Sequence, residues 1–307
     1  MKRAIVTGAT GFIGSWLAEE LIEHNYNVTL IVRDKDKLLK SLQEQCCIVE
    51  KQLQDIEPND LDNCDICYHL AWGGVSSVHK NDLNIQLENV RASLNLLETV
   101  SQSGCRRFIS TGTVAEYALC DNVMDMADRQ TPNDIYGAAK VSAHYFLEVR
   151  ARQLSQPFIW CVLPSTFGER RNDGNIVTYT IKALLNGEEP IYGDLHQMWD
   201  FLYVKDVVRA IRLIGEKGKT DKVYGIGSGE YHTLCEYITR IRDVIDPSLP
   251  LGFGKNKDQT SRTFSSCVNN YDLIRDTGFQ QLYSFEEGIK RTIDYWRDLK
   301  AKNNRRQ

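Results

Sequence analysis

Short apolar runs alternate with longer amphipathic stretches through the first 165 residues of the chain. The runs have the length and composition of buried strands and lie at residues 4–6, 28–32, 46–49, 66–70, 108–110 and 158–163. Between several of them apolar residues recur at helical spacing, as Ile13, Leu17 and Leu21 do. Strands that alternate with helices in this way form a parallel sheet covered by helices. The pattern therefore predicts an α/β fold with a doubly wound parallel sheet.

The pattern loosens after Pro164. Gly, Asn and Pro punctuate this part of the chain, and helical patterns recur near residues 176–185 and 234–244. Neither an internal repeat nor a low-complexity linker separates the two parts. A chain of 307 residues can form one large domain or two smaller ones.

Three glycines, each three residues from the next, lie between the first predicted strand and the first predicted helix. Gly8 and Gly11 permit turns that a Cβ would obstruct and let backbone amides approach a pyrophosphate, while Gly14 lets the helix pack closely on the sheet. The helix N-terminus would then face the phosphates. An ordinary glycine turn remains the alternative, because the commoner fingerprint has its first two glycines two apart. We interpret the segment as a dinucleotide site whose cofactor-binding residues are Gly8, Thr10, Gly11, Phe12, Ile13 and Gly14.

A second group of polar residues follows in the middle of the chain. Tyr136 and Lys140 are four residues apart in a predicted helix, so they share one face of it. The strand before them ends in hydroxyl residues, Ser110, Thr111 and Thr113. A parallel strand that ends in this way delivers side chains to the crevice in which such folds bind ligands.

Taken together, these motifs resemble the extended short-chain dehydrogenases/reductases, the nucleotide-sugar epimerase/dehydratase family, and the resemblance runs from Gly8 to about residue 279. It implies that Tyr136 exchanges a proton with the substrate oxygen and that Lys140 lowers the tyrosine pKa while binding the nicotinamide ribose. A free tyrosine has a pKa near 10, so its phenolate needs such positive charge at neutral pH. The same resemblance gives Thr111 a hydrogen bond to the reacting oxygen, with Ser110 and Thr113 as alternatives.

The resemblance also implies a domain organisation. A Rossmann-type NAD(P)-binding domain takes residues 1–166, with 201–232 returning to its sheet, and a smaller C-terminal α+β substrate lobe takes 167–200 and 233–307. Leu70 and Ala71 resemble the strand that runs beneath the cofactor, although a core strand explains them almost as well. Family members commonly form homodimers through two helices of the sheet domain, including the helix of Tyr136 and Lys140.

The end of the second predicted strand bears on the choice of cofactor. An acidic residue there binds the ribose 2′-hydroxyl of NAD, whereas an arginine accepts the 2′-phosphate of NADP. By alignment with the family, the usual acid falls on Val32, and Arg33 and Asp34 follow it. A guanidinium can pair with a phosphate bidentately and stack on adenine. We therefore favour NADP(H) over NAD(H), the alternative being that Arg33 is a solvated loop residue.

Two departures from the family narrow the reaction and the substrate. The 4,6-dehydratases carry an Asp-Glu pair after the position of Thr111, and this chain has Gly112 and Thr113 instead, so dehydration is not expected. The segment 190–206 resembles the one that holds nucleotide sugars, but Trp199 replaces an arginine that binds diphosphate, and Ser165 replaces an asparagine. A tryptophan can stack on a base or sugar but cannot neutralise phosphate. The candidate substrate-binding residues are Thr113, Ser165, Arg170, Trp199 and Arg262. Arg170, Arg171 and Arg262 either replace the missing diphosphate-binding arginine or are solvated surface residues.

Composition places few further limits. The formal net charge of −4 gives no reason to expect nucleic acid or an anionic membrane as a partner. No apolar run approaches the ~20 residues that a membrane span needs, and we expect a cytoplasmic protein. The nine cysteines argue against a disulfide framework. Cys64 and Cys67 have the spacing of a metal pair but lie in a predicted strand without a second pair, so we expect core thiols and no metal.

The leading hypothesis is an NADP(H)-dependent ketoreductase that acts on a nucleotide-linked 4-keto-6-deoxy sugar, with a nucleotide-diphosphate sugar as its substrate partner. One alternative is a nucleotide-sugar 4-epimerase that retains its NAD(P). Another is a non-sugar carbonyl reductase of the dihydroflavonol-reductase type, which Trp199 and Ser165 favour. A protein that binds dinucleotide without turnover is disfavoured by the complete set of Thr111, Tyr136 and Lys140.

Overall fold

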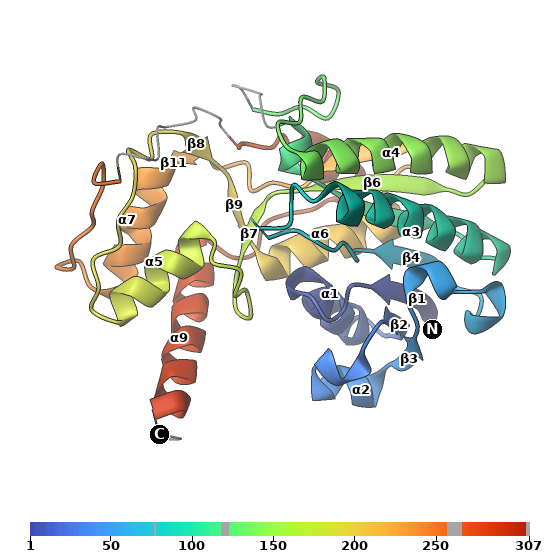
Figure 1. The fold of residues 1–307 in the computed structure, drawn as a ribbon, viewed down its shortest axis with the longest axis horizontal. Coiled ribbons are helices and arrows are strands. Elements are labelled where there is room, and N and C mark those ends of the chain that lie inside the picture. Colours follow the sequence, from blue (N-terminus) through green and yellow to red (C-terminus); the bar gives the residue numbers. More distant parts are fainter. Residues whose placement is uncertain (77, 118–122, 257–265, 305–307) are drawn as a thin grey trace.

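The computed structural model describes residues 1–76, 78–117, 123–256 and 266–304. Its main feature is a sheet of seven parallel strands in the order β10-β6-β5-β4-β1-β2-β3 (Figure 1). The strands are β1 Lys2–Thr7, β2 Tyr26–Val32, β3 Cys47–Glu50, β4 Ile66–His69, β5 Phe108–Thr113, β6 Phe158–Leu163 and β10 Lys222–Gly225. The order reverses between β1 and β4, which is where open α/β sheets bind their ligands. The predicted Rossmann-type α/β fold is confirmed.

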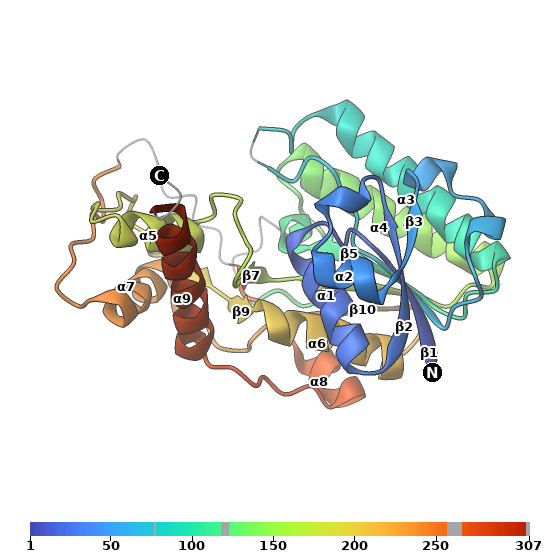
Figure 2. The same cartoon turned by 90° about the horizontal axis from the view of Figure 1, so that it is seen from below.

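Helices cover both faces of this sheet, which explains why its strands are continuous apolar runs. Helices α1 Phe12–Glu23 and α6 Val204–Lys217 pack on one face, and α3 Leu83–Gln102 and α4 Ile135–Leu154 pack on the other (Figures 1 and 2). All four residues of β4 are buried, as are the first five of β6. The short helix α2 Lys40–Gln45 lies beside α1, near the β2–β3 edge. A 3₁₀ turn, η4 Val114–Tyr117, follows β5, and further 3₁₀ turns are η1 Lys35–Lys37, η2 Leu53–Asp55 and η3 Pro58–Asp60.

A smaller group of elements has its own hydrophobic core beside the sheet domain. It contains α5 Ile176–Leu185, α7 Leu234–Ile245 and α9 Phe285–Asn304, with β8 Met198–Trp199 paired to β11 His232–Thr233 (Figure 1). Two further short strands, β7 Ser165–Phe167 and β9 Phe201–Tyr203, pair in parallel where the chain passes between the two parts. After β9 the chain returns through α6 and β10, so the segment 201–232 contributes a helix layer and the edge strand to the sheet domain.

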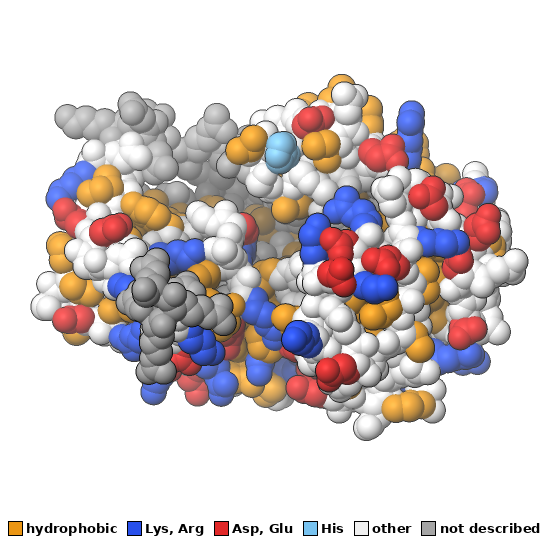
Figure 3. All heavy atoms as spheres, turned by 60° about the horizontal axis from the view of Figure 1, so that its bottom comes forward, with side chains coloured by type: hydrophobic (Ala, Val, Ile, Leu, Met, Phe, Trp, Pro, Cys, Tyr) orange, Lys and Arg blue, Asp and Glu red, His pale blue; other side chains and the backbone are white. Residues whose placement is uncertain are grey.

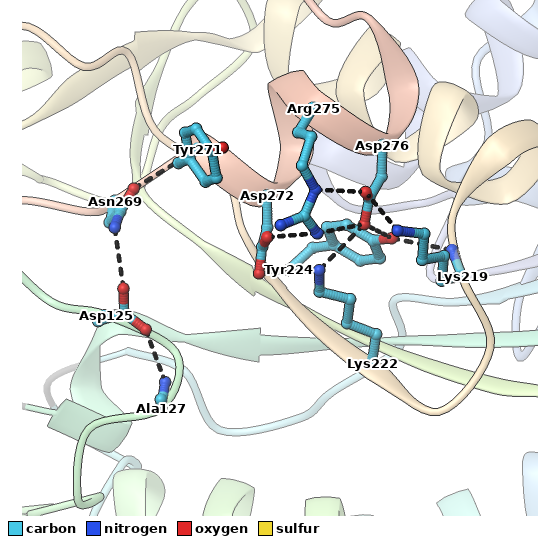
Figure 4. A network of polar contacts seen from close by, with 10 residues as sticks. All are labelled: Asp125, Ala127, Lys219, Lys222, Tyr224, Asn269, Tyr271, Asp272, Arg275 and Asp276. Carbon is cyan, nitrogen blue, oxygen red and sulfur yellow. Dashed lines mark hydrogen bonds and ion pairs between the residues drawn. The ribbon is translucent and has the colours of Figure 1, made fainter.

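The division of the chain expected from the sequence places helix α8 Tyr271–Thr277 in the smaller lobe. In the structure this helix lies against the sheet domain. It packs on α6 and β10, and Leu273 belongs to the core beneath the sheet. The Asp276 carboxylate fixes this contact, because it accepts from Tyr224 Oη at 2.9 Å and pairs with Lys219 and Lys222 at 2.9 and 3.0 Å (Figure 4). Arg275 adds a fourth donor. A buried carboxylate is stable only with such partners, and these come mainly from the end of α6 and from β10.

The surface carries mixed charge. On the face drawn in Figure 3, Lys and Arg side chains are interspersed with Asp and Glu and with hydrophobic residues. A search of the described part of the chain finds no helix that is long and apolar enough to cross a membrane.

Candidate active site

The glycine turn between β1 and α1 has the geometry of a phosphate cradle. Gly8 adopts a φ of +80°, and a Cβ there would lie 2.8 Å from the backbone nitrogen of Ala71. A Cβ on Gly14 would clash with the Gly8 carbonyl oxygen, so the helix can approach the turn only with glycine at this position. Gly11 is the N-cap of α1 and offers no side chain to the first-turn amides, which therefore remain available to an anion. These residues fit a dinucleotide.

Thr7 joins this turn to the end of β4. Its Oγ1 accepts hydrogen bonds from the backbone N–H groups of Leu70 and Ala71 at 3.2 and 3.1 Å. The same oxygen lies 2.8 Å from Nδ1 of His69, whose Nε2 lies 2.8 Å from Ser93 Oγ. Burial and the nearby Lys140 charge lower the pKa of His69 to about 3, so this imidazole is a neutral structural link.

A cavity of about 620 Å³ opens beside the glycine turn, which is the size of many small-molecule sites. The predicted cofactor residues Gly8, Thr10, Gly11, Arg33, Leu70 and Ala71 line it, together with Trp72, Gly73 and Asn89. Phe12, Ile13 and Gly14 lie on the adjoining first turn of α1. The structure thus brings most of the predicted cofactor residues around one cavity.

Arg33, which lines this cavity, and Asp34, which follows it in the chain, differ in their surroundings. The Asp34 carboxylate accepts from Asp36 N–H at 3.1 Å, where it caps η1, and pairs with Lys37 at 3.2 Å. Arg33 lines the cavity, and within the described residues its guanidinium forms neither a hydrogen bond nor an ion pair. The Arg33 guanidinium is therefore available to a ligand, whereas the Asp34 carboxylate is already bound to Asp36 and Lys37.

Tyr136 and Lys140 lie on α4, directly above the end of β5. The Lys140 ammonium donates to the carbonyl oxygen of Thr111 at 2.7 Å. The Thr113 side chain hydrogen-bonds Tyr136, whereas the Thr111 hydroxyl donates to the His69 carbonyl oxygen at 3.3 Å. The structure therefore places Thr113, the alternative, in contact with the tyrosine, and the hydrogen bond from Thr111 to the reacting oxygen stays a prediction. Thr113 makes this contact because β5 extends to it, two residues closer to the helix.

Burial controls the protonation of this pair. It raises the pKa of Tyr136 to about 12, although the Thr113 hydrogen bond acts in the opposite direction. It lowers the pKa of Lys140 to about 7, opposed by the negative charge of Glu116. The expected lowering of the tyrosine pKa is thus not found in the protein alone, because desolvation of the phenolate outweighs the charges around it. Tyr136 is protonated at neutral pH and can act as a proton donor.

Glu116 of η4 is a fully buried carboxylate behind this pair. It accepts from Thr113 N–H at 2.8 Å, Gln130 Nε2 at 2.9 Å and Trp160 Nε1 at 3.2 Å. Burial raises its pKa to about 7, while its hydrogen bonds and the Lys140 charge act against burial. Both carboxylate oxygens are occupied by N–H donors, so this group organises the end of β5 and does not face a substrate.

Comparison with known proteins decides the family. A family model described as NAD dependent epimerase/dehydratase matches residues 4–227. The chain belongs to this family. The family predicted from the glycine turn and from the Tyr136 and Lys140 pair is therefore confirmed.

Relatives within the epimerase/dehydratase family have several activities. The dTDP-4-dehydro-6-deoxyglucose reductase of Escherichia coli is 28% identical over 81% of this chain and 84% of its own length. The dTDP-glucose 4,6-dehydratase of Neisseria gonorrhoeae is 23% identical over 98% and 97%. A trifunctional UDP-glucose 4,6-dehydratase, UDP-4-keto-6-deoxy-D-glucose 3,5-epimerase and UDP-4-keto-L-rhamnose reductase from Arabidopsis thaliana is 24% identical over 96% of this chain, which spans only 47% of that protein.

Solved structures agree on the fold. A UDP-glucose 4-epimerase from Thermotoga maritima, solved with UDP-glucose, superposes with a TM-score of 0.81 at 26% identity and covers 97% of this chain and 99% of its own. A UDP-N-acetylglucosamine 4-epimerase from Methanobrevibacter ruminantium reaches a TM-score of 0.87 at 24% identity, with the same coverage. These likenesses extend over both the sheet domain and the smaller lobe.

The predicted substrate residues are only partly gathered near Tyr136. Arg170 is held on α1, where its guanidinium lies 3.5 Å from the centre of the Trp16 ring and pairs with Glu19. Its neighbour Arg171 is the cation whose charge acts on Tyr136, although it also pairs with Asp173 at 2.8 Å. Ser165 begins β7, close to the chain crossing. Arg170 is thus held on α1, whereas Arg171 lies within electrostatic range of Tyr136.

The remaining predicted positions lie in the lobe or beyond the described residues. Trp199 lies on β8 with its ring centre 6.4 Å from that of Phe201, and its buried Nε1 has no partner among the described atoms. Arg262 lies outside the described residues. Cys64 and Cys67 are buried thiols, and no group of three metal-binding side chains occurs in the described part of the chain.

Two side chains near the reaction residues were missed by the sequence reasoning. Trp72 directly follows Leu70 and Ala71, and its ring lies over the Lys140 ammonium. Glu116 is the single charged residue of the otherwise apolar turn η4. A large aromatic residue beside a cofactor strand, and a charge within an apolar turn, were the available signals. Neither signal indicates which residue, distant in the sequence, the Trp72 or Glu116 side chain contacts.

Proposed function

We propose that this protein is an NADP(H)-dependent reductase of a nucleotide-linked 4-keto-6-deoxy sugar. The observation that carries the proposal is Arg33, which lines the cavity and whose guanidinium has no partner among the described residues, while Asp34 is engaged elsewhere. An unpaired guanidinium suits the 2′-phosphate that distinguishes NADP from NAD. Net reduction of a substrate consumes NADPH, so the oxidised cofactor must leave the protein and be replaced after each turnover.

The absence of a suitable carboxylate supports reduction over dehydration. The two positions after Thr111 are Gly112 and Thr113, and neither provides an acid or base for the loss of water. The nearby Glu116 carboxylate is saturated by three N–H donors. The 28% identity with the Escherichia coli dTDP-4-dehydro-6-deoxyglucose reductase is in line with this choice.

The residues then have distinct roles in the proposed reaction. When bound, the nicotinamide supplies the hydride. Tyr136 donates its proton to the carbonyl oxygen of the substrate, and its raised pKa keeps that proton in place until the reaction begins. Thr113 orients the tyrosine hydroxyl, and Lys140 binds the nicotinamide ribose and stabilises the phenolate once it forms. Gly8, Gly11 and the first turn of α1 hold the pyrophosphate.

The test is to mix the protein with NADPH and a panel of nucleotide-linked 4-keto-6-deoxy sugars while following the nicotinamide absorbance beside an NADH control. We expect stoichiometric loss of NADPH with one sugar. Tyr136→Phe should abolish this turnover but leave NADPH binding unchanged, as measured by the fluorescence of the reduced nicotinamide. Full turnover by the variant would contradict the assignment of the proton donor.

A second candidate function is a nucleotide-sugar 4-epimerase, in which the same residues oxidise and then reduce one carbon. The 26% identity with the Thermotoga maritima UDP-glucose 4-epimerase favours it. Cofactor that stays bound through purification, together with interconversion of unmodified nucleotide sugars, would identify this activity. Reduction of a dihydroflavonol-type carbonyl compound instead would identify the third candidate, which Trp199 and Ser165 favour because they replace the family's polar ligands.

We also propose that the protein forms a homodimer through α3 and α4. These two helices pack side by side, and their outer surface exposes Leu83, Leu87, Tyr145, Phe146 and Val149. Large apolar side chains that gather on neighbouring helices are typical of an interface. Because α4 also carries Tyr136 and Lys140, such a dimer would stabilise the helix that holds the reaction residues.

A further inference from the structure

The Lys140 ammonium lies in an unusual environment for a buried cation. Its side chain is only 4% exposed, and in the described part of the chain no carboxylate lies within ion-pair distance of it. Among the described residues, its hydrogen-bond acceptor is the carbonyl oxygen of Thr111. A buried charge normally needs closer compensation than this.

The Trp72 ring supplies the nearest compensation. The Lys140 Nζ lies 3.8 Å from the centre of that ring, well within the range of a cation–π contact, and 5.9 Å from the ring of Trp160. The Trp72 ring also meets Tyr136 edge-on, with 6.5 Å between the ring centres. The indole therefore contacts both members of the reaction pair and lines the cavity that the cofactor would fill.

Helix α3 fixes this position of the indole. Trp72 Nε1 donates to Gln86 Oε1 at 2.8 Å, and Gln86 Nε2 donates to the Gly74 carbonyl oxygen at 3.0 Å. One turn further along, Asn89 accepts from Gly73 N–H at 2.8 Å and donates to the Gly73 carbonyl oxygen at 2.9 Å. Four hydrogen bonds thus hold residues 72–74 against α3, and the ring is not free to leave the lysine.

We propose that Trp72 is a positioning residue for Lys140, whose ring face holds the ammonium charge at the reaction site in place of a contacting carboxylate. The importance of this lysine for turnover rests on the proposed function. Its protonation can be measured without any turnover, so the two proposals can fail separately.

Other titratable groups surround the lysine. They are Glu116 of η4, His69 of β4, and Tyr136 and His144 of its own helix. Burial lowers the pKa of His69 to about 3 and that of His144 to about 4, and raises that of Tyr136 to about 12. Of these groups, only Glu116 also ionises between pH 5 and 10, so Lys140 titrates beside it.

The test follows the ¹³Cε signal of Lys140 with pH in cofactor-free protein that contains labelled lysine, and Lys140→Arg assigns the signal. Trp72→Phe and Trp72→Met both lose the hydrogen bond to Gln86, but only the phenylalanine keeps a ring face. We expect the Met variant to titrate about one pH unit below the wild type, which corresponds to about 1.4 kcal/mol, and the Phe variant to lie between them. Equal midpoints in the two variants, or no shift in either, would overturn the proposal.

A remote lysine–tryptophan pair provides a matched control. Lys182 lies 4.0 Å from the ring of Trp296 in the lobe, so Trp296→Met removes a similar contact and should leave the Lys140 midpoint unchanged. Should Trp72→Met fail to fold, incorporation of fluorinated tryptophan weakens the ring face without changing its shape. It should lower the midpoint more in the wild type than in Trp72→Phe, where the only labelled ring near Lys140 among the described residues is that of Trp160 at 5.9 Å. An unchanged midpoint in the wild type would equally refute the role of the ring.

The kinetic consequence separates this inference from the proposed function. If the wild type reduces a keto sugar, its kcat should fall at alkaline pH. In Trp72→Met this fall should move to lower pH by the same number of pH units as the Lys140 midpoint measured by NMR. A shifted midpoint in a protein that reduces none of the sugars would refute the reductase proposal and leave the role of Trp72 intact.

Discussion

Replacing Glu116 by glutamine should change how the stability of the protein depends on pH. The carboxyl is fully buried, and burial raises its pKa from 4.5 to about 7. Below pH 4.5 the group is protonated in both the folded and the unfolded chain. As the pH rises from there, the unfolded chain releases this proton while the folded protein retains it until about pH 7.

The magnitude follows from the size of this shift. A shift of about 2.5 pH units corresponds to about 3 kcal/mol, so the wild type loses roughly that much stability from this group between pH 4.5 and 7. Glutamine does not titrate and escapes this loss. Gln130 Oε1 has no partner among the described atoms and can turn to accept from the new amide, whereas Trp160 Nε1 loses its acceptor. That loss does not depend on pH, so it shifts the whole stability curve of the variant and leaves its slope unchanged. The stability of Glu116→Gln relative to the wild type should therefore rise with pH across this window.

The assay is urea unfolding of both proteins at pH 5, 6, 7 and 8, with the exposed Glu188→Gln as the control. The two stability curves should diverge with pH for Glu116→Gln and stay parallel for Glu188→Gln. Repeating the pair in a Lys140→Met background should widen the divergence, because the ammonium that lowers the Glu116 pKa is gone. Parallel curves for Glu116→Gln in both backgrounds would refute the reasoning.

Three further predictions concern the cofactor, the reaction and the assembly. Arg33→Ala should weaken NADPH binding roughly tenfold to hundredfold, by the loss of a charge-assisted contact, and leave NADH binding unchanged in a fluorescence titration; equal losses for both would contradict the 2′-phosphate role. Thr113→Val should lower kcat roughly hundredfold in the NADPH assay, whereas Thr111→Val should lower it far less, and the reverse order would return the role to Thr111. Phe146→Glu should halve the mass measured by light scattering, and a monomeric wild type would refute the dimer.

The sheet could be predicted because its strands are buried on both faces. A strand such as β6 must be apolar at nearly every position, so it stands out from the amphipathic helices around it. The last sheet strand, β10, is less evident, because it is short and its first two residues are only half-buried. Helix α8 could not be assigned to the sheet domain from sequence, since the carboxylate that holds it, Asp276, finds its donors on β10 and after α6.

The sequence by itself determined the features that depend on local geometry. Gly8 is needed for a positive φ and a close backbone approach, and the four-residue spacing of Tyr136 and Lys140 puts them on one face of a helix. Only the tertiary structure decided what surrounds that pair. It placed Thr113 on the tyrosine, the Trp72 ring on the lysine and the Glu116 carboxylate behind both. Such contacts join residues from different elements, and their energies depend on burial and distance, which a linear pattern does not contain.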